Sequence, residues 1–278
     1  MCCASLPNQP GCHLKGKLIA TGNTAEVFAW GQDRVLKLFW PEYTPQAEGE
    51  FTAARAVHAA GLPAPAAYEV VEVEGRKGIV FERLGGPTML DVLLARPWRL
   101  KRLARTMAEL HVRAHSLHSQ QPEALRQVLL RALQQDRYLL PPHLREGARR
   151  LLEQLPDGSS VLHGDFHPIN IIMSGRGPVI IDWPDVTRGD PAADVARTWL
   201  LTCQGHIPPG TREGGVIHLL RRPFYRAYLH HYRQLRPLPQ ETLEAWKIPV
   251  VAGRLASEAI PPEEQVMLVK FLERRLRG

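Results

Sequence analysis

Three oxygen-bearing side chains lie close together in the sequence, in a polar loop and directly after the apolar run that follows it. The loop, residues 163–170, reads HGDFHPIN, and the later run ends in IDW at residues 181–183. Asp165 and Asn170 leave the same loop, and Asp182 follows the next expected strand, so all three can converge on one point. Carboxylate and amide oxygens suit Mg²⁺, which completes its coordination shell with water and phosphate oxygens. The pattern therefore indicates phosphoryl transfer, with one carboxylate left to receive the proton of an attacking hydroxyl.

A lysine lies in an unusually apolar stretch near the other end of the chain. Lys37 is the centre of residues 35–39, which read VLKLF. A buried ammonium group needs an anionic partner or loses its proton. The alternative is a lysine at a sheet edge whose ammonium reaches back to water. If Lys37 is buried, a partner carboxylate is therefore predicted.

The elements that position these residues change in character along the chain. Alternating apolar residues and good turn formers predict strands, which we expect at residues 17–20, 25–30, 34–39, 68–73 and 78–81. One helix is expected at residues 48–60, ended by Gly61. After a break at residues 84–87, helical spacing dominates, and the expected helices are 100–114, 121–135, 142–155, 192–203, 212–233, 240–257 and 262–276. Short strands at 161–162 and 179–181 flank the polar loop.

This change predicts an α+β protein in three parts. Residues 1–14 form a flexible tail, residues 15–84 a small β-rich lobe, and residues 85–278 a larger helical lobe. The composition, 44% hydrophobic and 23% charged, is typical of a globular protein with a real core. No apolar run approaches the ~18 residues of a membrane-spanning helix, and the N-terminus lacks the order of a secretory signal. We therefore expect a cytoplasmic protein without a membrane partner.

The net charge of +7 is unevenly distributed. Of the 35 lysines and arginines, 27 follow residue 84, as do 19 of the 28 acidic residues, so the surplus of eight positive charges belongs to the helical lobe. No cluster of aromatic and basic residues in the sequence resembles a stacking platform for bases, so nucleic acid binding is not predicted. The oligomeric state is left open.

The segments HGDFHPINII, IDW and GDPAADVA, in this order, closely resemble the aminoglycoside phosphotransferase-like family of small-molecule kinases, which are related to protein kinases. The resemblance implies a bilobal protein-kinase-like fold, with a small antiparallel-sheet N-lobe that binds the nucleotide and a larger helical C-lobe that carries the catalytic loop and the acceptor site. It further implies that the γ-phosphate of ATP is moved to a hydroxyl of a small molecule, with Mg²⁺ as the second cofactor.

The resemblance also implies roles for single residues of the helical lobe. Asp165 matches the catalytic aspartate, and His163 matches the histidine that braces the loop. Asn170 and Asp182 match the two Mg²⁺ ligands. A structural acidic pair is matched by Asp190 and Asp194, which we expect to cap the helix that begins near Pro191.

In the β-rich lobe, the resemblance implies a nucleotide site. Lys37 matches the lysine that contacts the α- and β-phosphates and pairs with a helix glutamate, for which Glu50 fits the family's spacing better than Glu48. The phosphate-covering loop is matched by Gly22, Asn23 and Thr24, although it has one glycine where protein kinases have G-x-G-x-x-G. Backbone groups of about Glu82 and Leu84 match the hinge that binds adenine.

Several alternatives remain at this stage. A regulatory protein of the same fold could bind the nucleotide without turnover, although Lys37, Asp165, Asn170 and Asp182 are all intact. His163, Asp165 and His167 could ligate a transition metal, and Cys2, Cys3, Cys12 and His13 could hold zinc. An aromatic stripe at Phe224, Tyr228 and His231, with Tyr225 and Tyr232 beside it, indicates core packing or the wall of an acceptor pocket.

The identity of the acceptor is not determined by the sequence. Aminoglycosides are polycations, and the basic surplus of the helical lobe disfavours them unless a local acidic pocket exists. The candidate acids for such a pocket are Asp185, Glu241, Glu244 and Glu258. Choline, homoserine, sugars and macrolides, which the wider family also phosphorylates, remain open.

Overall fold

The structure is a computed structural model, and it describes residues 15–135, 140–205, 214–258 and 260–276. The chain divides between Leu84 and Gly85 into two compact units. The expected flexible tail, with Cys2, Cys3, Cys12 and His13, lies outside the described residues.

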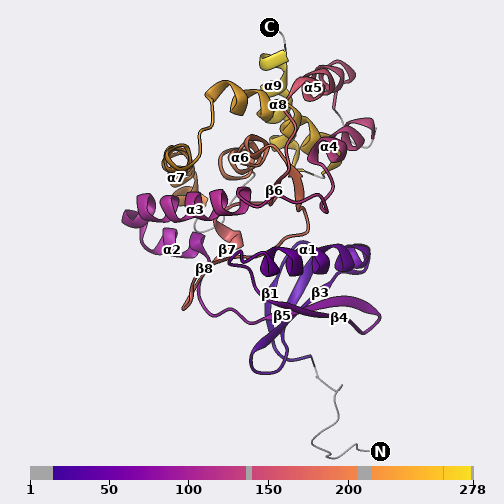
Figure 1. Ribbon diagram of the computed structural model, residues 1–278, viewed down its shortest axis with the longest axis vertical. Helices are drawn as coiled ribbons and strands as arrows, with labels where there is room; N and C mark the ends of the chain where they lie inside the picture. The colour runs from indigo at the N-terminus through magenta and orange to yellow at the C-terminus, as the bar shows by residue number, and fades with distance from the viewer. Residues whose placement is uncertain (1–14, 136–139, 206–213, 259, 277–278) are drawn as a thin grey trace, which may run out of the picture. The chain divides into compact units, whose positions relative to one another are not determined.

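The first unit is an antiparallel sheet of five strands with one helix. The strands are β1 (Leu18–Thr21), β2 (Ala25–Ala29), β3 (Arg34–Phe39), β4 (Ala67–Val73) and β5 (Arg76–Glu82), in the spatial order β1-β2-β3-β5-β4. A 3₁₀ turn at Pro41–Gln46 leads into helix α1 (Ala47–Ala59), which lies across the sheet (Figure 1). The register of β3 places Lys37 opposite Val27 of β2 and Ile79 of β5, so Lys37 occupies a central strand.

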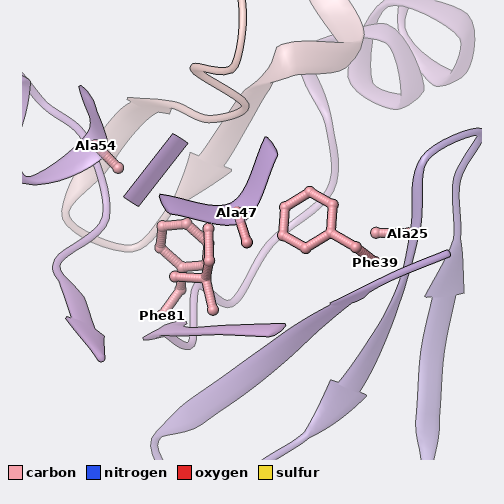
Figure 2. Packing of buried hydrophobic residues seen from close by; sticks show 6 residues of the cluster. Ala25, Phe39, Ala47, Ala54 and Phe81 are labelled. Carbon is pink, nitrogen blue, oxygen red and sulfur yellow. The ribbon is translucent and has the colours of Figure 1, made fainter. Parts of the chain in front are cut away.

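Alternation along the strands separates two apolar clusters, one on each face of the sheet. One cluster includes Leu36, Leu38 and Val80. The other joins the sheet to α1 and contains Ala25, Phe39, Ala47, Ala54, Ile79 and Phe81. Figure 2 shows the small side chain of Ala47 beside the rings of Phe39 and Phe81. Because alanines line this side of α1, the helix can approach the sheet closely, which brings its first turn within reach of β3.

The second unit is mainly helical. Its helices are α2 (Met89–Ala95), α3 (Leu100–His115), α4 (Leu125–Gln134), α5 (Pro142–Gln154), α6 (Pro191–Trp199), α7 (Gly214–Leu235), α8 (Gln240–Ser257) and α9 (Pro262–Leu276). Helix α3 packs along α7, and α8 packs against α4, α5 and α6 (Figure 1). Most of α8 from Trp246 onward is buried, including Val251 and Leu255, so this helix forms the centre of the unit's core.

Four short strands support the polar loop. They form two antiparallel pairs, β6 (Ser160–Leu162) with β9 (Thr187–Gly189), and β7 (Ile171–Ser174) with β8 (Gly177–Ile180). The sequence predicted β6 and β8 but not β7, β9 or α2, because elements this short hold too few residues to show a period. Helix α2 did carry a local signal, a capping box between Thr88 and Asp91.

The predicted α+β class is thus confirmed, with a sheet-based unit followed by a helical one. Helix boundaries agree with the expectations to within a few residues, with two differences of substance. The helix expected at 192–203 ends at Trp199 and continues as a π-helical turn over Leu200–Gln204. The helix expected at 121–135 begins only at Leu125. Within the described residues, no helix has the length and apolar character needed to cross a membrane.

Candidate active site

His163 connects the two segments that carry the candidate site in the second unit. Its imidazole is fully buried, and its Nδ1 accepts a hydrogen bond from the backbone N–H of Asp165 at 3.2 Å. Its Nε2 lies 3.1 Å from the carbonyl oxygen of Ile181. A carbonyl only accepts, so Nε2 carries the proton and the ring is neutral. Burial lowers the pKa of His163, in agreement with this neutral form. The histidine therefore ties the Asp165 loop to the residue before Asp182.

Asp165 and Asn170 contact each other directly. The Asn170 side-chain nitrogen donates to the Asp165 carboxylate at 2.8 Å and to the Asp165 backbone carbonyl at 2.9 Å. Both partners are pure acceptors, so the Asn170 amide must face them with its nitrogen. Its Oδ1 then points away from Asp165, in the orientation that a cation ligand requires. The amide is thereby a positioning group and a candidate ligand at once.

The Asp165 carboxylate is ionised. Burial by itself raises the pKa of Asp165, but the nearby His167, whose Nε2 lies 3.4 Å from Oδ2, and the positive charge of Arg197 hold it well below its ordinary value. A carboxylate of this kind is a weak base toward a free alcohol. It is suited to orienting a hydroxyl and to accepting the proton late, once the bond to phosphorus is forming.

Asp182 is brought to the same place by the β7–β8 ladder. Asn170 directly precedes β7, and the backbone N–H of Ile181 donates to the Asn170 carbonyl at 2.9 Å, so Asp182 follows a residue bonded to Asn170. Asp182 has φ 67°, in the left-handed region that few residues other than glycine adopt. This conformation ends the strand abruptly and turns the chain at the carboxylate. Strained backbone of this kind is typical of functional positions.

Helix α6 holds the catalytic loop by side chains three and four residues apart on one face. Asp194 accepts hydrogen bonds from the backbone N–H groups of His163 at 2.6 Å and Gly164 at 3.0 Å. Arg197 Nε donates to the Gly164 carbonyl at 3.0 Å, and Thr198 Oγ1 donates to the Phe166 carbonyl at 2.9 Å. The helix therefore satisfies the polar backbone of a loop that is buried away from water.

The expected capping role is correct for one member of the acidic pair and wrong for the other. Asp190 is the N-cap of α6 and accepts from the backbone N–H of Ala192 at 2.7 Å. Asp194 instead lies inside the helix, fully buried, with its carboxylate aimed at the loop. Side chains in the first turn of a helix point outward, so Asp194 can reach a neighbouring segment, whereas a cap must lie just before the helix.

Two further histidines, which the sequence analysis did not single out, complete the surroundings of Asp194. His111 and His115 lie one turn apart on α3, and their Nε2 atoms are 3.0 and 3.2 Å from Asp194 Oδ2. Their Nδ1 atoms accept from the hydroxyls of Tyr228 and Tyr232 on α7, at 2.6 and 2.8 Å. Two histidines spaced i, i+4 on the apolar face of a helix were the available signal, because a buried imidazole needs polar partners.

This cluster explains the aromatic stripe of α7. Phe224, Tyr225, Tyr228 and Tyr232 are buried, so these four rings pack in the core, whereas His231 is only partly buried. Tyr228 and Tyr232 each donate to a histidine, and each of these two histidines donates to Asp194. The Asp194 carboxylate is therefore ionised and surrounded by four N–H donors, two from the histidines and two from the loop backbone. Although burial alone raises the pKa of Asp194, His111 and His115 hold it well below its ordinary value.

His111, His115 and Asp194 form the only group of at least three His, Cys, Asp or Glu side chains in the described residues that is close enough to share a metal ion. Hydrogen bonds fully account for it, since every partner of the carboxylate is an N–H donor. The transition-metal alternative through His163, Asp165 and His167 is wrong, because both ring nitrogens of His163 are engaged by backbone groups.

We expect the stability of the protein to fall in mild acid through His111. Burial, together with the charge of His115, lowers the pKa of His111 from 6.5 to about 3. Below pH 6.5 the unfolded chain takes up a proton at this residue that the folded chain refuses, so the free energy of unfolding drops by about 1.4 kcal/mol per pH unit for this group. Urea unfolding of His111→Gln between pH 7.5 and 4.5 should show a shallower slope than the parent.

The matched control for this experiment is His231→Gln, which removes a partly exposed histidine of α7 and should keep the parental slope. His163 remains in both variants, so the slope in His111→Gln is reduced and not abolished. An unchanged slope in His111→Gln would show that this histidine is protonated in the folded protein.

Gly164 is required by its surroundings. Its φ is +80°, and a Cβ there would meet the Asp185 carbonyl oxygen at 2.5 Å. We expect Gly164→Ala to lose about 1–3 kcal/mol of stability and to displace the Asp165 backbone. Thermal unfolding and turnover should both decline. Gly175→Ala, in the β7–β8 turn with no atom within 4 Å, is the control expected to match the parent.

In the first unit, Lys37 forms its ion pair with Glu50. The ammonium lies 2.7 and 2.8 Å from the two carboxylate oxygens, and the Glu50 side chain is 2% exposed. Glu48 instead pairs with Lys77 on the outer side of the helix, where both side chains are well exposed. Lys37, the charged residue within the apolar run of β3, therefore has the buried anionic partner that its position requires.

The segments matched to phosphate and adenine binding lie at strand ends, because residues 22–24 join β1 to β2 and Glu82 is the last residue of β5. Gly22, Asn23 and Thr24 form the β1–β2 turn, which is held by a hydrogen bond from the Gly22 N–H to the Ala25 carbonyl at 2.8 Å. The Glu82 N–H donates to the Ala66 carbonyl at 2.9 Å. Among the described residues, the Leu84 N–H makes no hydrogen bond, so Leu84 keeps a backbone donor available.

Two of the acids considered for an acceptor pocket lie near the loop of residues 163–170. Asp185 packs directly on Gly164, next to Asp165. Glu258 pairs with Arg197, which donates to the Gly164 carbonyl. Glu244 instead pairs with Lys247 and Arg275. Asp185 is thus the candidate that contacts the loop directly.

The family model of the Phosphotransferase enzyme family (APH) matches residues 15–245 of the chain. The chain belongs to this family. The match spans both units and includes Lys37, Glu50 and the whole catalytic loop. A comparison with curated proteins finds no match.

Solved structures with the same fold include several kinases of small molecules. The amicoumacin kinase hAmiN, in complex with AMP-PNP, Ca²⁺ and Ami, is 14% identical, with a TM-score of 0.62 over 95% of this chain and 88% of that one. An aminoglycoside-3'-phosphotransferase of type VIII is 19% identical, with a TM-score of 0.58 over 87% and 93%. The ADP-bound aminoglycoside phosphotransferase APH(2'')-Ib is 16% identical, with a TM-score of 0.56 over 94% and 92%. At these identities the likeness establishes the fold.

Membership of the phosphotransferase enzyme family confirms the resemblance seen in the sequence.

Proposed function

We propose that this protein transfers the γ-phosphate of ATP to a hydroxyl group of a small molecule. The observation that carries the proposal is the network around His163, in which one neutral imidazole ties the Asp165 backbone to Ile181 while the Asn170 amide bonds Asp165. A catalytic carboxylate and two candidate metal ligands are thereby held by the same few hydrogen bonds. Preorganisation of this kind is what phosphoryl transfer requires, because positioning and charge neutralisation supply most of the catalysis.

In this proposal, Asp165 orients the acceptor hydroxyl in line with the γ-phosphate and takes its proton. The ionised state of Asp165 and its bond from Asn170 suit this role, because a charged carboxylate with one oxygen engaged keeps the other for the hydroxyl. His163 and helix α6 keep the carboxylate in place. Loss of the contacts from His163 or from α6 would displace the Asp165 carboxylate oxygen without removing the carboxylate itself.

The oxygen donors of Asn170 and Asp182 fit Mg²⁺. Asn170 turns its amide oxygen away from Asp165, and Asp182 follows a residue bonded to the Asn170 backbone. An oxygen-only pair leaves most of the coordination shell to water and phosphate, as Mg²⁺ prefers. When bound, the metal would neutralise the charge that develops on the phosphate oxygens.

The first unit, residues 15–84, would bind the nucleotide. Lys37, held by Glu50, would contact the α- and β-phosphates, and the backbone of the turn at Gly22, Asn23 and Thr24 would cover them. The carbonyl of Glu82 and the N–H of Leu84 would bind adenine. The related structures that hold ADP, AMP-PNP or GDP support a purine nucleotide as donor.

The second unit would bind the acceptor beside Asp165. Asp185 is the acid that packs on Gly164. It would favour an acceptor that carries an amine near the reacting hydroxyl, as aminoglycosides and amino alcohols do. A cytoplasmic location and the absence of a membrane partner, both expected from the sequence, stay predictions.

The test is an acceptor panel with MgATP that contains aminoglycosides, a macrolide, choline, homoserine and sugars. ADP release and the mass of the phosphorylated product are measured together, with and without EDTA. We expect one acceptor to gain a phosphate at a rate that EDTA abolishes. MgATP binding without any product would favour the nucleotide-binding regulatory protein instead. ADP release without a phosphorylated acceptor would indicate simple hydrolysis.

A further inference from the structure

A separate pocket of about 550 Å³ lies in the second unit between α2, the start of α3 and the β7–β8 hairpin. These elements lie close together in Figure 1. Its apolar lining includes Val92, Leu103 and Met173, and its charged lining is Arg96, Arg99 and Arg102. None of the residues assigned to nucleotide, metal or acceptor binding lines it. Its volume falls within the usual range for small-molecule sites.

The walls of this pocket are fixed by the fold. The Met173 N–H donates to the Pro87 carbonyl at 2.9 Å, and Thr88 bridges to Ile172. Gly86 has φ +134°, and a Cβ there would meet the Met173 carbonyl oxygen at 2.3 Å, so the segment before α2 presses directly on β7. The pocket therefore exists before any ligand arrives.

Among the described residues that line the pocket, three arginines face one aspartate, so positive charge is in excess. In the described residues, the side chains of Arg96, Arg99 and Arg102 have no hydrogen bond or ion pair, and the only acid of the lining, Asp91, is occupied by its capping box with Thr88. Residues 92–108 contain five basic residues and no acid. This segment contributes much of the positive surplus of the helical unit.

The start of α3 adds to this positive potential. Arg99 is the N-cap of the helix, its side chain makes no capping bond, and the first turn holds no acid. Acidic residues are favoured at this end of a helix and cations are disfavoured, so the arrangement costs stability in the free protein. An anion bound in the pocket would offset that cost.

We propose that this pocket binds a small amphipathic anion, an aromatic or aliphatic body that carries one carboxylate, sulfonate or phosphate group. The apolar lining accommodates the body, and the arginines pair with the anionic group, for which the guanidinium is well suited. The size of the pocket favours a discrete small molecule over a polymer. Trp98, next to these arginines and 76% exposed, is the one feature nearby that would suit a membrane surface or a nucleic acid strand instead.

The test uses two fluorescent probes with the same body. 8-Anilinonaphthalene-1-sulfonate carries a sulfonate, and N-phenyl-1-naphthylamine is its uncharged counterpart. Titrations are made on the full chain in saturating MgATP, which excludes the nucleotide site. We expect saturable one-to-one binding of the sulfonate, at least about tenfold tighter than the neutral probe, as for a hydrogen bond to a charged group.

Three variants locate the binding. The double variant Arg99→Gln, Arg102→Gln should weaken the sulfonate at least about tenfold and leave the neutral probe unchanged. Ala95→Trp, which places a large ring at the pocket lining, should weaken both probes. Lys101→Gln removes an exposed charge that does not line the pocket and should match the parent. The side chains of Arg99 and Arg102 have no partners to lose, and equal thermal unfolding temperatures would verify that the variants fold.

Four outcomes would overturn the proposal. They are no binding of the sulfonate, equal affinity for the two probes, binding that the arginine variants do not change, and binding that a parallel titration without MgATP shows but saturating MgATP abolishes. Vesicles of phosphatidylglycerol and a 20-nucleotide oligo(dT) are added as further arms. Suppose that the sulfonate probe does not bind and that the vesicles or the oligonucleotide do. If the Trp98→Ala substitution abolishes that binding, this face would be assigned to a membrane or to a nucleic acid.

Discussion

Asp165→Asn is expected to abolish nearly all phosphoryl transfer while nucleotide affinity stays at the parental value. The asparagine has the same shape and can still accept the hydrogen bond from Asn170, but it can neither take a proton nor orient a hydroxyl by charge. Loss of a positioned base costs about 10²–10⁴-fold in turnover. The measurement is kcat with the acceptor that the panel identifies, together with the Kd for MgATP by calorimetry.

Asp157→Asn is the matched control. Asp157 is an exposed acid 3.7 Å from Arg126, so its replacement should leave both constants unchanged. Circular dichroism and thermal unfolding of Asp165→Asn must match the parent before its kinetics are interpreted. A correctly folded Asp165→Asn enzyme with a tenth or more of the parental turnover would refute the assigned role.

Asp194→Asn is expected to have the largest effect on stability. Four N–H groups converge on this buried carboxylate, two from the catalytic loop backbone and two from His111 and His115. An asparagine supplies one oxygen and turns an NH₂ toward the remaining donors. Removing one partner of a buried charged network typically costs about 3–5 kcal/mol, a large part of the ~5–15 kcal/mol that stabilises most domains. Urea unfolding measures the loss.

Asp190→Ala distinguishes this role from helix capping. Asp190 bonds only the first turn of α6, so its loss should cost about 1 kcal/mol. If Asp194→Asn gives no soluble protein, Thr198→Val removes the bond to the Phe166 carbonyl and the contact of this hydroxyl with Tyr228. It should lower both stability and turnover by a smaller amount. A larger loss in Asp190→Ala than in Asp194→Asn would show that the acidic pair serves the helix and not the loop.

The expected effects of these substitutions on turnover and on stability differ because the residues contact the loop of residues 163–170 in different ways. Asp165 contacts the reacting groups in the proposed mechanism, whereas Asp194 and His163 act on it through the backbone. Substitution of Asp165 should change turnover and spare stability, and substitution of Asp194 should change both. Measuring the two quantities on the same variants therefore separates the catalytic residue from the positioning residues.

Local features of the chain could be predicted well from the sequence. The alternation in residues 25–39 determines two strands, and the helical spacing after residue 100 determines the larger unit, because these periods depend only on which face of an element is buried. The spacing of Asp165, Asn170 and Asp182 likewise predicted oxygen-bearing side chains in a loop and after a strand, and the structure places them there. The apolar run around Lys37 predicted an anionic partner if the lysine was buried, and Glu50 is that partner.

Partners between distant segments were decided only by the tertiary structure. Glu48 is two residues closer to Lys37 in sequence than Glu50 is, yet Glu50 is the partner. The choice depends on how α1 is rotated on the sheet, which the packing of Ala47 and Ala54 against Phe39 and Phe81 sets. The role of Asp194 depends on two histidines about 80 residues earlier and on tyrosines of α7. A sequence shows that a buried charge needs partners, but only the packing of helices selects which of several donors meets it.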